Sequence, residues 1–153
     1  MKVEYVNPFV TSAFNVLEAV LRQSPDRGPL SMLPSTHTSE QMNVCVGVTG
    51  DVQGIVIYGM SLVTADKVAS TMIGQTIKTF DELAASAIAE LCNMISGGAS
   101  TLLSGAGYVC DITPPTLIRG AKCKISTFDI PTLVVPVIIE QGEIKVTVGL
   151  RHK

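Results

Sequence analysis

The chain has 153 residues and a mass of 16.2 kDa, so we expect one domain over residues 1–153. Hydrophobic residues make up 46% and charged residues 16%, a composition that excludes an intrinsically disordered chain. The net charge is −2 and the basic residues form no run, which argues against a protein that binds nucleic acid by neutralising phosphates.

Cysteine usage and the apolar segments indicate a cytoplasmic protein without a membrane span. The four cysteines are scattered and form no CxxC pair, and the two histidines lie far from them in sequence, so we expect reduced thiols and no zinc site. The charged start of the chain does not resemble a signal peptide. The longest uncharged run, residues 91–110, contains four glycines and several polar residues, which would insert poorly into lipid.

The first half of the chain predicts a helix, a hairpin and a short helix. Asn7 and Pro8 form a candidate N-cap and first helical residue, and apolar spacing extends a helix over 8–23. Residues 24–39 contain three prolines and indicate a loop with room for one short strand. Alternating apolar residues around Thr49-Gly50-Asp51 then predict a hairpin. A short helix capped by Thr64 follows and ends at Gly74.

The second half predicts a long helix and then strands. Thr79 and Glu82 have the spacing of a capping box, and the helical pattern continues to about Ser104, with a bend or break at Gly97-Gly98. Strand patterns follow over residues 108–112, 122–128, 133–139 and 143–150, with a tight turn at Gln141-Gly142 between the last two. The prediction is an α+β fold with a mainly antiparallel sheet covered on one face by helices. The repeated order of helix and strands indicates an internal duplication.

One face of the long helix differs from an ordinary solvated surface. Ser86, Glu90 and Asn93 fall within about 60° of one another. The core-facing stripe is predicted on the opposite side, at Ala84, Ile88, Leu91, Ile95 and Leu102. The other members of the polar face are Glu82, Gly97, Ser100, Thr101 and Ser104. Between Lys78 and Cys110 there is no lysine or arginine, although a solvated face normally pairs Lys with Glu. Spacing alone leaves open a plain solvated face or a docking surface for a partner that brings a cation and a water.

The pattern Ser86-x-x-x-Glu90-x-x-Asn93, followed some twenty residues later by Pro114-Pro115, resembles the signature of the CheC/CheX/FliY phosphatases of bacterial chemotaxis. Residues 81–90, 50–58 and 111–116 resemble the CheX type, which has a single site. The resemblance therefore implies the CheC-like fold. The sequence departs from the pattern in having Ser rather than Asp at the first position, and either proline fits the last one.

The resemblance implies that the substrate is the phosphoaspartate of a phosphorylated CheY-like response regulator, which supplies its own Mg²⁺ and a lysine. No metal or cofactor need be carried by this chain. Because an amide both accepts and donates hydrogen bonds, Asn93 is expected to position the attacking water. Glu90 is expected to pair with the lysine of the regulator. Ser86, Gly97, Pro114 and Pro115 are expected to contact the partner.

Two other functions stay open at this point: a CheX-like module that docks a receiver without hydrolysis, and a structural component of the flagellar switch. The resemblance also implies a homodimer in which sheet edges of two subunits join, leaving one regulator site open on each subunit. The apolar strand 133–139, with Pro131 before it and Pro136 inside it, is predicted at such an edge. The alternative is a central strand covered on both faces.

Overall fold

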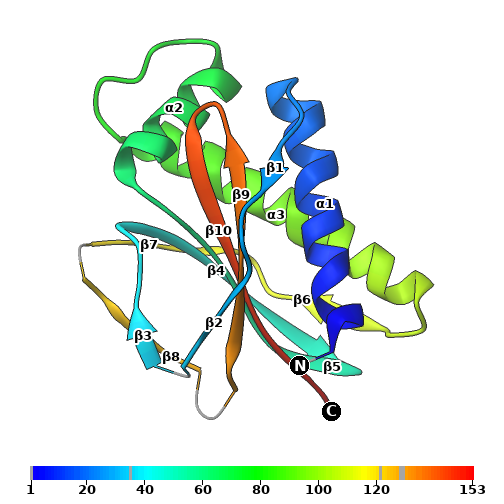
Figure 1. Cartoon of the computed structure of the whole chain (residues 1–153). Helices are drawn as coiled ribbons and strands as arrows, with labels where there is room; N and C mark the ends of the chain where they lie inside the picture. Colours follow the sequence, from blue (N-terminus) through cyan, green and yellow to red (C-terminus); the bar gives the residue numbers. More distant parts are fainter. Residues whose placement is uncertain (1, 35, 121, 128–129) are drawn as a thin grey trace.

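Three helices cover one face of an antiparallel sheet, as predicted (Figure 1). The computed structural model describes residues 2–34, 36–120, 122–127 and 130–153. The helices are α1 (Val3–Leu21), α2 (Leu62–Ile73) and α3 (Glu82–Gly105). The strands are β1 (Asp26–Arg27), β2 (Ser31–Leu33), β3 (Thr36–Thr38), β4 (Met42–Gly50), β5 (Val52–Met60), β6 (Cys110–Ile112), β7 (Thr116–Arg119), β8 (Lys124–Ser126), β9 (Thr132–Ile139) and β10 (Gly142–His152). No helix in this part of the chain has both the length and the apolarity needed to cross a bilayer.

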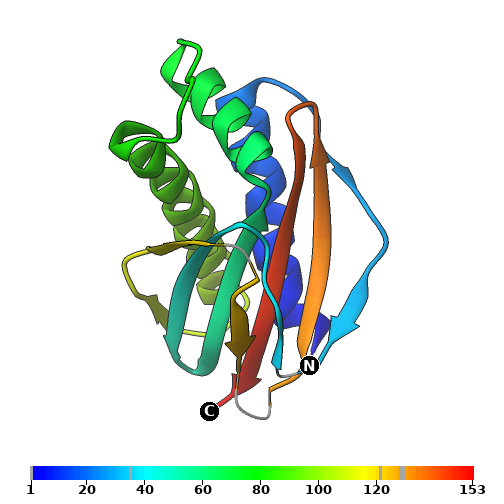
Figure 2. The same cartoon turned by 90° about the vertical axis from the view of Figure 1, so that its left-hand side faces the viewer.

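The sheet is built symmetrically about its central pair of strands. β5 pairs with β10 at the centre, β4 and β9 flank them, and the short strands β6 and β7 or β1 and β2 form the two edges. Strands β3 and β8 pair with each other and lie in front of this sheet, with the helices behind it, in Figure 2. Two units with the order helix, three short strands and a hairpin are thus related across the β5–β10 pair. This topology agrees with the expected internal duplication.

Helix α1 begins five residues earlier than predicted. It starts at Val3 and contains Pro8, which the sequence had placed at the first helical position. A proline inside a helix removes a hydrogen bond and costs about 3 kcal/mol. The extra turns bury Tyr5 and Val6, and the Tyr5 ring packs edge-on against Tyr108 with 5.3 Å between centroids. Tertiary packing of this first turn therefore outweighs the local signal of Pro8.

The N-caps of α2 and α3 also differ from the prediction. The Ser61 hydroxyl, not that of Thr64, caps α2, accepting from the Thr64 backbone N–H at 3.1 Å. Asp81, not Thr79, caps α3 and accepts from the Ala84 N–H at 2.9 Å. The observed cap lies three residues before the predicted one in α2 and two residues after it in α3. The predicted end of α2 at Gly74 is confirmed, and Gly74 has a left-handed backbone conformation.

Both predicted hairpins form, whereas several short strands were not predicted. β4 pairs with β5 around Asp51, and β9 pairs with β10 in a register that places Gly142 opposite Ile139. The region predicted as a loop contains β1, β2 and β3, and β7 follows the two prolines. β8 occupies only part of the predicted strand 122–128, whose last residue, Phe128, lies outside the described residues. Strands this short depend on their neighbours and leave little local pattern.

Strand β9 is not at an edge, so the predicted edge position is wrong. It pairs with β10 on one side and with β1 and β2 on the other. Pro136, which cannot donate a ladder hydrogen bond, falls between the residues paired with β1 and those paired with β2. The Pro136 carbonyl instead accepts from the Gly28 N–H at 2.9 Å. The free edges are therefore β1–β2 and β6–β7.

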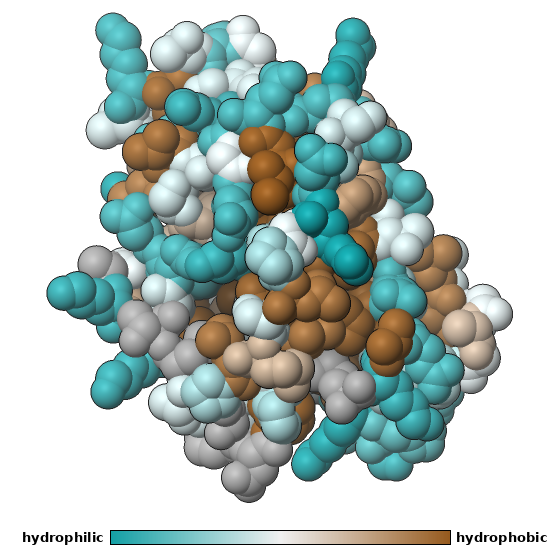
Figure 3. All heavy atoms as spheres, viewed as in Figure 1, coloured by the Kyte–Doolittle hydropathy of each residue, from teal (hydrophilic) through white to brown (hydrophobic). Residues whose placement is uncertain are grey.

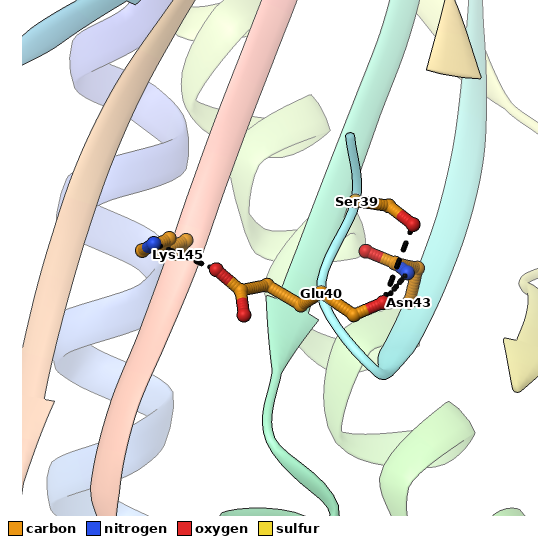
Figure 4. A network of polar contacts seen from close by, with 4 residues as sticks. All are labelled: Ser39, Glu40, Asn43 and Lys145. Atoms are coloured by element: carbon orange, nitrogen blue, oxygen red, sulfur yellow. Dashed lines mark hydrogen bonds and ion pairs between the residues drawn. The ribbon is translucent and has the colours of Figure 1, made fainter. Parts of the chain in front are cut away.

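The face of the sheet opposite the helices carries a network of paired polar groups (Figure 4). The Lys145 ammonium lies 2.6 Å from a Glu40 carboxylate oxygen. The Glu40 carbonyl accepts from the Asn43 amide at 2.8 Å and from the Ser39 hydroxyl at 3.2 Å. These contacts hold the segment before β4 against the sheet, beside a cavity of about 180 Å³.

Candidate functional site

Helix α3 carries Ser86, Glu90, Asn93 and Gly97 and is helical without interruption from Glu82 to Gly105, so the chain does not break at Gly97-Gly98. A Cβ at Gly98 would collide with the Ser12 hydroxyl of α1. Glycine is therefore required at this position for the close approach of α1 and α3, which pack against each other in Figure 1.

Two buried hydrogen bonds fix the rotation of α3 about its axis. The Ser12 hydroxyl donates to the Ile95 carbonyl at 2.6 Å. The hydroxyls of Tyr58 on β5 and Ser96 on α3 lie 2.7 Å apart. Burial raises the pKa of the Tyr58 phenol, so this contact remains between neutral groups. Because both bonds lie within one turn of Asn93, they hold that residue on the outer side of the helix.

The inner side of α3 follows the prediction over its first four turns. Ala84, Ile88, Leu91 and Ile95 are fully buried. Leu102, predicted in the same stripe, is instead 40% exposed, and Leu103 is buried in its place. The last turns of α3 pack beside β6, at the edge of the sheet, and the buried side of the helix changes accordingly.

The outer side of α3 presents the predicted motif. Ser86 and Glu90 are exposed, whereas Asn93 and Gly97 are half-buried. Within the described part of the chain, the side chains of Ser86, Glu90 and Asn93 have no hydrogen-bond or ion-pair partner. The carboxylate and the amide are therefore both available to another molecule.

Asn93 lies on the side of α3 that faces strands β6 and β7. Its helical phase is within about 20° of both Glu82 and Ser100. The Ser100 hydroxyl donates to the Cys110 carbonyl of β6 at 3.1 Å. Glu82 lines a hollow of about 310 Å³ together with Leu117 of β7. The strand segment thus forms one wall beside the amide.

The two motif prolines lie in this wall, between β6 and β7. The segment is attached to α3 at one end by the Ser100 bond and at the other by Arg119, whose guanidinium donates to the Phe80 carbonyl at 3.1 Å. In Figure 2 it runs beside α3 at the margin of the molecule. Pro114, exposed, and Pro115, half-buried, lie between these two attachments to α3. The fold therefore brings the distant parts of the motif to one side of the molecule.

Sequence reasoning missed two apolar residues on the same face. Leu83 is 60% exposed and Met94 is 40% exposed. They stand seven residues before and four residues after Glu90, spacings that return to the same side of a helix. The spacing was visible in the sequence, but an outward Leu looks like a core residue until burial is known.

Cys92, the neighbour of Asn93, points into the core, and burial raises the pKa of its thiol. It therefore stays protonated and is a poor nucleophile. The four cysteines are free. In the described ranges, no three His, Cys, Asp or Glu side chains lie close enough together to hold a metal ion. The groups presented outward are an amide, a carboxylate and a hydroxyl, which suit orienting a water and pairing with a cation.

The first helix does not repeat this site. The interval from the helix end to the next strand is the same in both units, from Leu21 to Asp26 and from Gly105 to Cys110. Counting back from the helix ends, the counterpart of Asn93 on α1 is Phe9, which is completely buried. Only α3 therefore presents this amide to a partner.

Comparison with known proteins identifies the family. Residues 42–148, which include the whole motif helix, match the family described as chemotaxis phosphatase CheX. The CheY-P phosphatase CheX of Thermotoga maritima is 36% identical over 131 residues, covering 85% of this chain and 84% of the relative.

Solved structures agree with this assignment. CheX in the CheX–CheY–BeF₃–Mg²⁺ complex of Borrelia burgdorferi has a TM-score of 0.84 and 31% identity, covering 99% of this chain and 100% of that one. A chemotaxis protein CheX of Desulfovibrio desulfuricans has a TM-score of 0.85 and 27% identity, with 99% and 100% coverage. With its sheet, its motif helix and these relatives in agreement, the chain belongs to the CheX family of chemotaxis phosphatases.

Proposed function

We propose that this chain hydrolyses the phosphoaspartate of a CheY-type response regulator, with Asn93 and Glu90 of α3 as the acting residues. The observation that carries the proposal is the outward pair of an amide and a carboxylate without partners in the described chain, at the family spacing. The name of the Thermotoga relative, a CheY-P phosphatase, and the Borrelia complex of CheX with CheY support it. A cytoplasmic location follows from this substrate.

Asn93 is the catalytic residue in this proposal. An acyl phosphate is already reactive, so the helper has only to hold a water in line with the scissile bond. The water oxygen bonds to phosphorus, the bond from phosphorus to the aspartate oxygen breaks, and the aspartate leaves as a carboxylate. The water loses a proton to the phosphate product or to solvent. Mg²⁺ belongs to the regulator, and the neutral amide adds no charge that would repel the phosphoryl oxygens.

Glu90 orients the receiver on α3. One turn from Asn93 on the same face, its carboxylate can pair with the lysine that a receiver domain holds beside its phosphoryl group. Ser86 lies one further turn away, at the rim. Gly97 leaves space on the other side, and Pro114 and Pro115 shape the wall next to Asn93. These four positions contact the partner without taking part in the chemical step.

The test is a time course of phosphoaspartate loss. CheY-type receivers from the same genome, phosphorylated with acetyl phosphate and Mg²⁺, are mixed with a tenfold smaller amount of this protein. We expect hydrolysis of many receivers per molecule of protein. Tight binding of the receiver without faster hydrolysis would instead identify a docking module and contradict the proposal.

We further propose a homodimer, formed along the β1–β2 edge rather than through β9. This edge consists of short strands and carries two exposed apolar residues, Leu30 and Met32. Ile138 of β9, which pairs with Asp26 of β1, is exposed as well. Figure 3 shows hydrophobic residues gathered in the middle of the face on which β2 and β9 lie in Figure 1. Pairing here leaves the opposite edge, beside Asn93, open on each subunit. Light scattering should give twice 16.2 kDa, and the monomer mass would contradict the dimer.

A further inference from the structure

The outer face of α3 has an apolar side as well as a polar one. Leu83 and Met94 lie within about 20° and 40° of Glu90 in helical phase. Leu83 is 60% exposed and Met94 is 40% exposed, whereas the residues on the inner side of α3 are buried in the core. Because they stand on the same face as the unpaired Glu90 carboxylate, these two side chains offer apolar area that a partner docked on Glu90 would bury.

The two sides of Glu90 are different. Asn93 lies toward β6 and β7, as described above. Met94 lies on the other side, within about 40° of Gly98, which packs against α1. A partner centred on Glu90 would therefore meet the Asn93 amide and the β6–β7 segment on one side, and the apolar side chains of Leu83 and Met94 on the other.

Resting on the proposed function, we propose that Leu83 and Met94 form an apolar flank, defined by these two residues, that binds an apolar patch of the receiver next to its phosphorylation site. The flank sets the affinity for the receiver and excludes water from one side of the Glu90–lysine pair. Residues that surround a central contact and keep water away from it strengthen that contact. Methionine adapts its shape to a partner surface, which suits this position.

The charges on α3 favour a receiver over a second copy of this chain. A two-fold dimer through this face would bring Glu82 and Glu90 of both copies together. Because no lysine or arginine lies between Lys78 and Cys110, α3 offers no positive charge to offset that repulsion. A receiver domain brings the lysine and Mg²⁺ that the face lacks.

The test compares outward apolar residues that are matched in exposure. Leu83→Gln is compared with Val63→Gln, since Val63 is 62% exposed and is likewise the second residue of its helix. Met94→Gln is compared with Leu102→Gln, since both residues are 40% exposed on α3 but Leu102 is about 120° away from Glu90. Glutamine keeps a long side chain and a similar helix propensity, so all four variants should fold.

Affinity is measured with a CheY-type receiver loaded with beryllium fluoride and Mg²⁺, and kcat and KM with the phosphorylated receiver. We expect binding to weaken about five- to twentyfold for Leu83→Gln and about three- to eightfold for Met94→Gln, as expected from burial of their exposed fractions. KM should rise in parallel and kcat should stay within about twofold. Added salt should weaken binding of Met94→Gln more steeply than that of the wild type. The two control variants should bind like the wild type.

Equal losses in the controls, a lower kcat with unchanged KM, or a change in oligomeric mass instead of receiver affinity would each overturn the flank. Wild-type affinity in both test variants would overturn it as well, while leaving the proposed hydrolysis in place. A wild-type protein that binds the receiver but does not speed hydrolysis would refute the proposed function, and the affinities would still decide the role of the flank.

Discussion

The outer face of α3 and the face of the sheet that is not covered by helices differ in whether their polar groups are paired. On the sheet, Glu40 has the Lys145 ammonium at its carboxylate and the Asn43 amide at its carbonyl. On α3, Glu90 and Asn93 have no such partner within the described residues. Paired polar groups stabilise the fold in place, whereas groups left free beside an apolar flank are available for recognition. The presence or absence of a partner within the described residues therefore distinguishes the structural carboxylate Glu40 from the proposed functional carboxylate Glu90.

Changing Asn93 should have the largest effect. Asn93→Ala should lower phosphoaspartate hydrolysis about 10²-fold or more, since one positioned polar group is lost from the transition state. Asn93→Asp, with nearly the same shape, should fail as well because its charge repels the phosphoryl oxygens. Thermal unfolding should match the wild type, since the Asn93 side chain has no hydrogen-bond partner among the described residues. Hydrolysis near the wild-type rate in either variant would remove Asn93 from the chemistry.

Changing Glu90 should act on binding. Glu90→Ala should weaken affinity for the beryllium fluoride form of the receiver by about 2 kcal/mol, the lower limit for truncating one member of a buried charge pair. Isothermal titration at two salt concentrations measures this, and added salt should reduce the difference between variant and wild type. Glu18→Ala, which removes an exposed carboxylate from α1 outside the proposed site, is the matched control and should bind normally. Unchanged affinity on loss of Glu90 would contradict its role in docking.

The neighbouring glycines of α3 should respond in opposite directions. Gly98→Ala should lower the free energy of unfolding by about 1–2 kcal/mol, because the new methyl group forces Ser12 away from the Ile95 carbonyl. Gly97→Ala meets no atom within 4 Å and should raise stability by about 0.5–1 kcal/mol through helix propensity. Chemical denaturation measures both changes. A stabilised Gly98→Ala would show that the two helices are not in close contact there.

The sheet network should give the smallest effect. Glu40→Gln should lower the free energy of unfolding by about 0.2–1 kcal/mol, as for other exposed pairs. The hydrogen bond to Glu40 raises the pKa of Lys145 above its ordinary value of 10.5. The contribution of the pair should therefore be complete below about pH 10 and disappear as the pH rises through the raised pKa. Glu18→Gln serves as a control, and a difference that grows at alkaline pH would have the wrong sign.

Long, strongly patterned elements could be predicted from the sequence. The extent of α3 and both hairpins follow from apolar spacing and turn residues, and these elements fix the layers of the fold. The outward direction of Asn93 follows from the same spacing. What failed depends on tertiary contacts: the burial of Tyr5 draws α1 past Pro8, and the position of α3 beside β6 exposes Leu102.

The site was only partly visible in the sequence for a related reason. Glu90 and Asn93 belong to a recognisable motif, and the family match supports reading them as such. The position of Pro114 and Pro115 could not be predicted, because it depends on the pairing of β7 with β4. Strand β7 has only four residues, too few for a recognisable pattern. The flank residues could be recognised only once their exposure was known, because periodicity alone cannot tell whether Met94 is exposed or covered by another element.

The central β5–β10 pair has a consequence for how the chain folds during synthesis. Tyr58 of β5 is paired with Val146 of β10, some ninety residues later. At about 5–20 residues per second, a ribosome needs roughly 5–20 s to supply β10 after β5 has emerged. During that interval the β4–β5 hairpin has an open, Val- and Ile-rich strand that can pair with other nascent chains. Because the two hairpins pair with each other at the centre of the sheet, the sheet can be completed only after β10 has been synthesised. The emerging chain is exposed to aggregation until then.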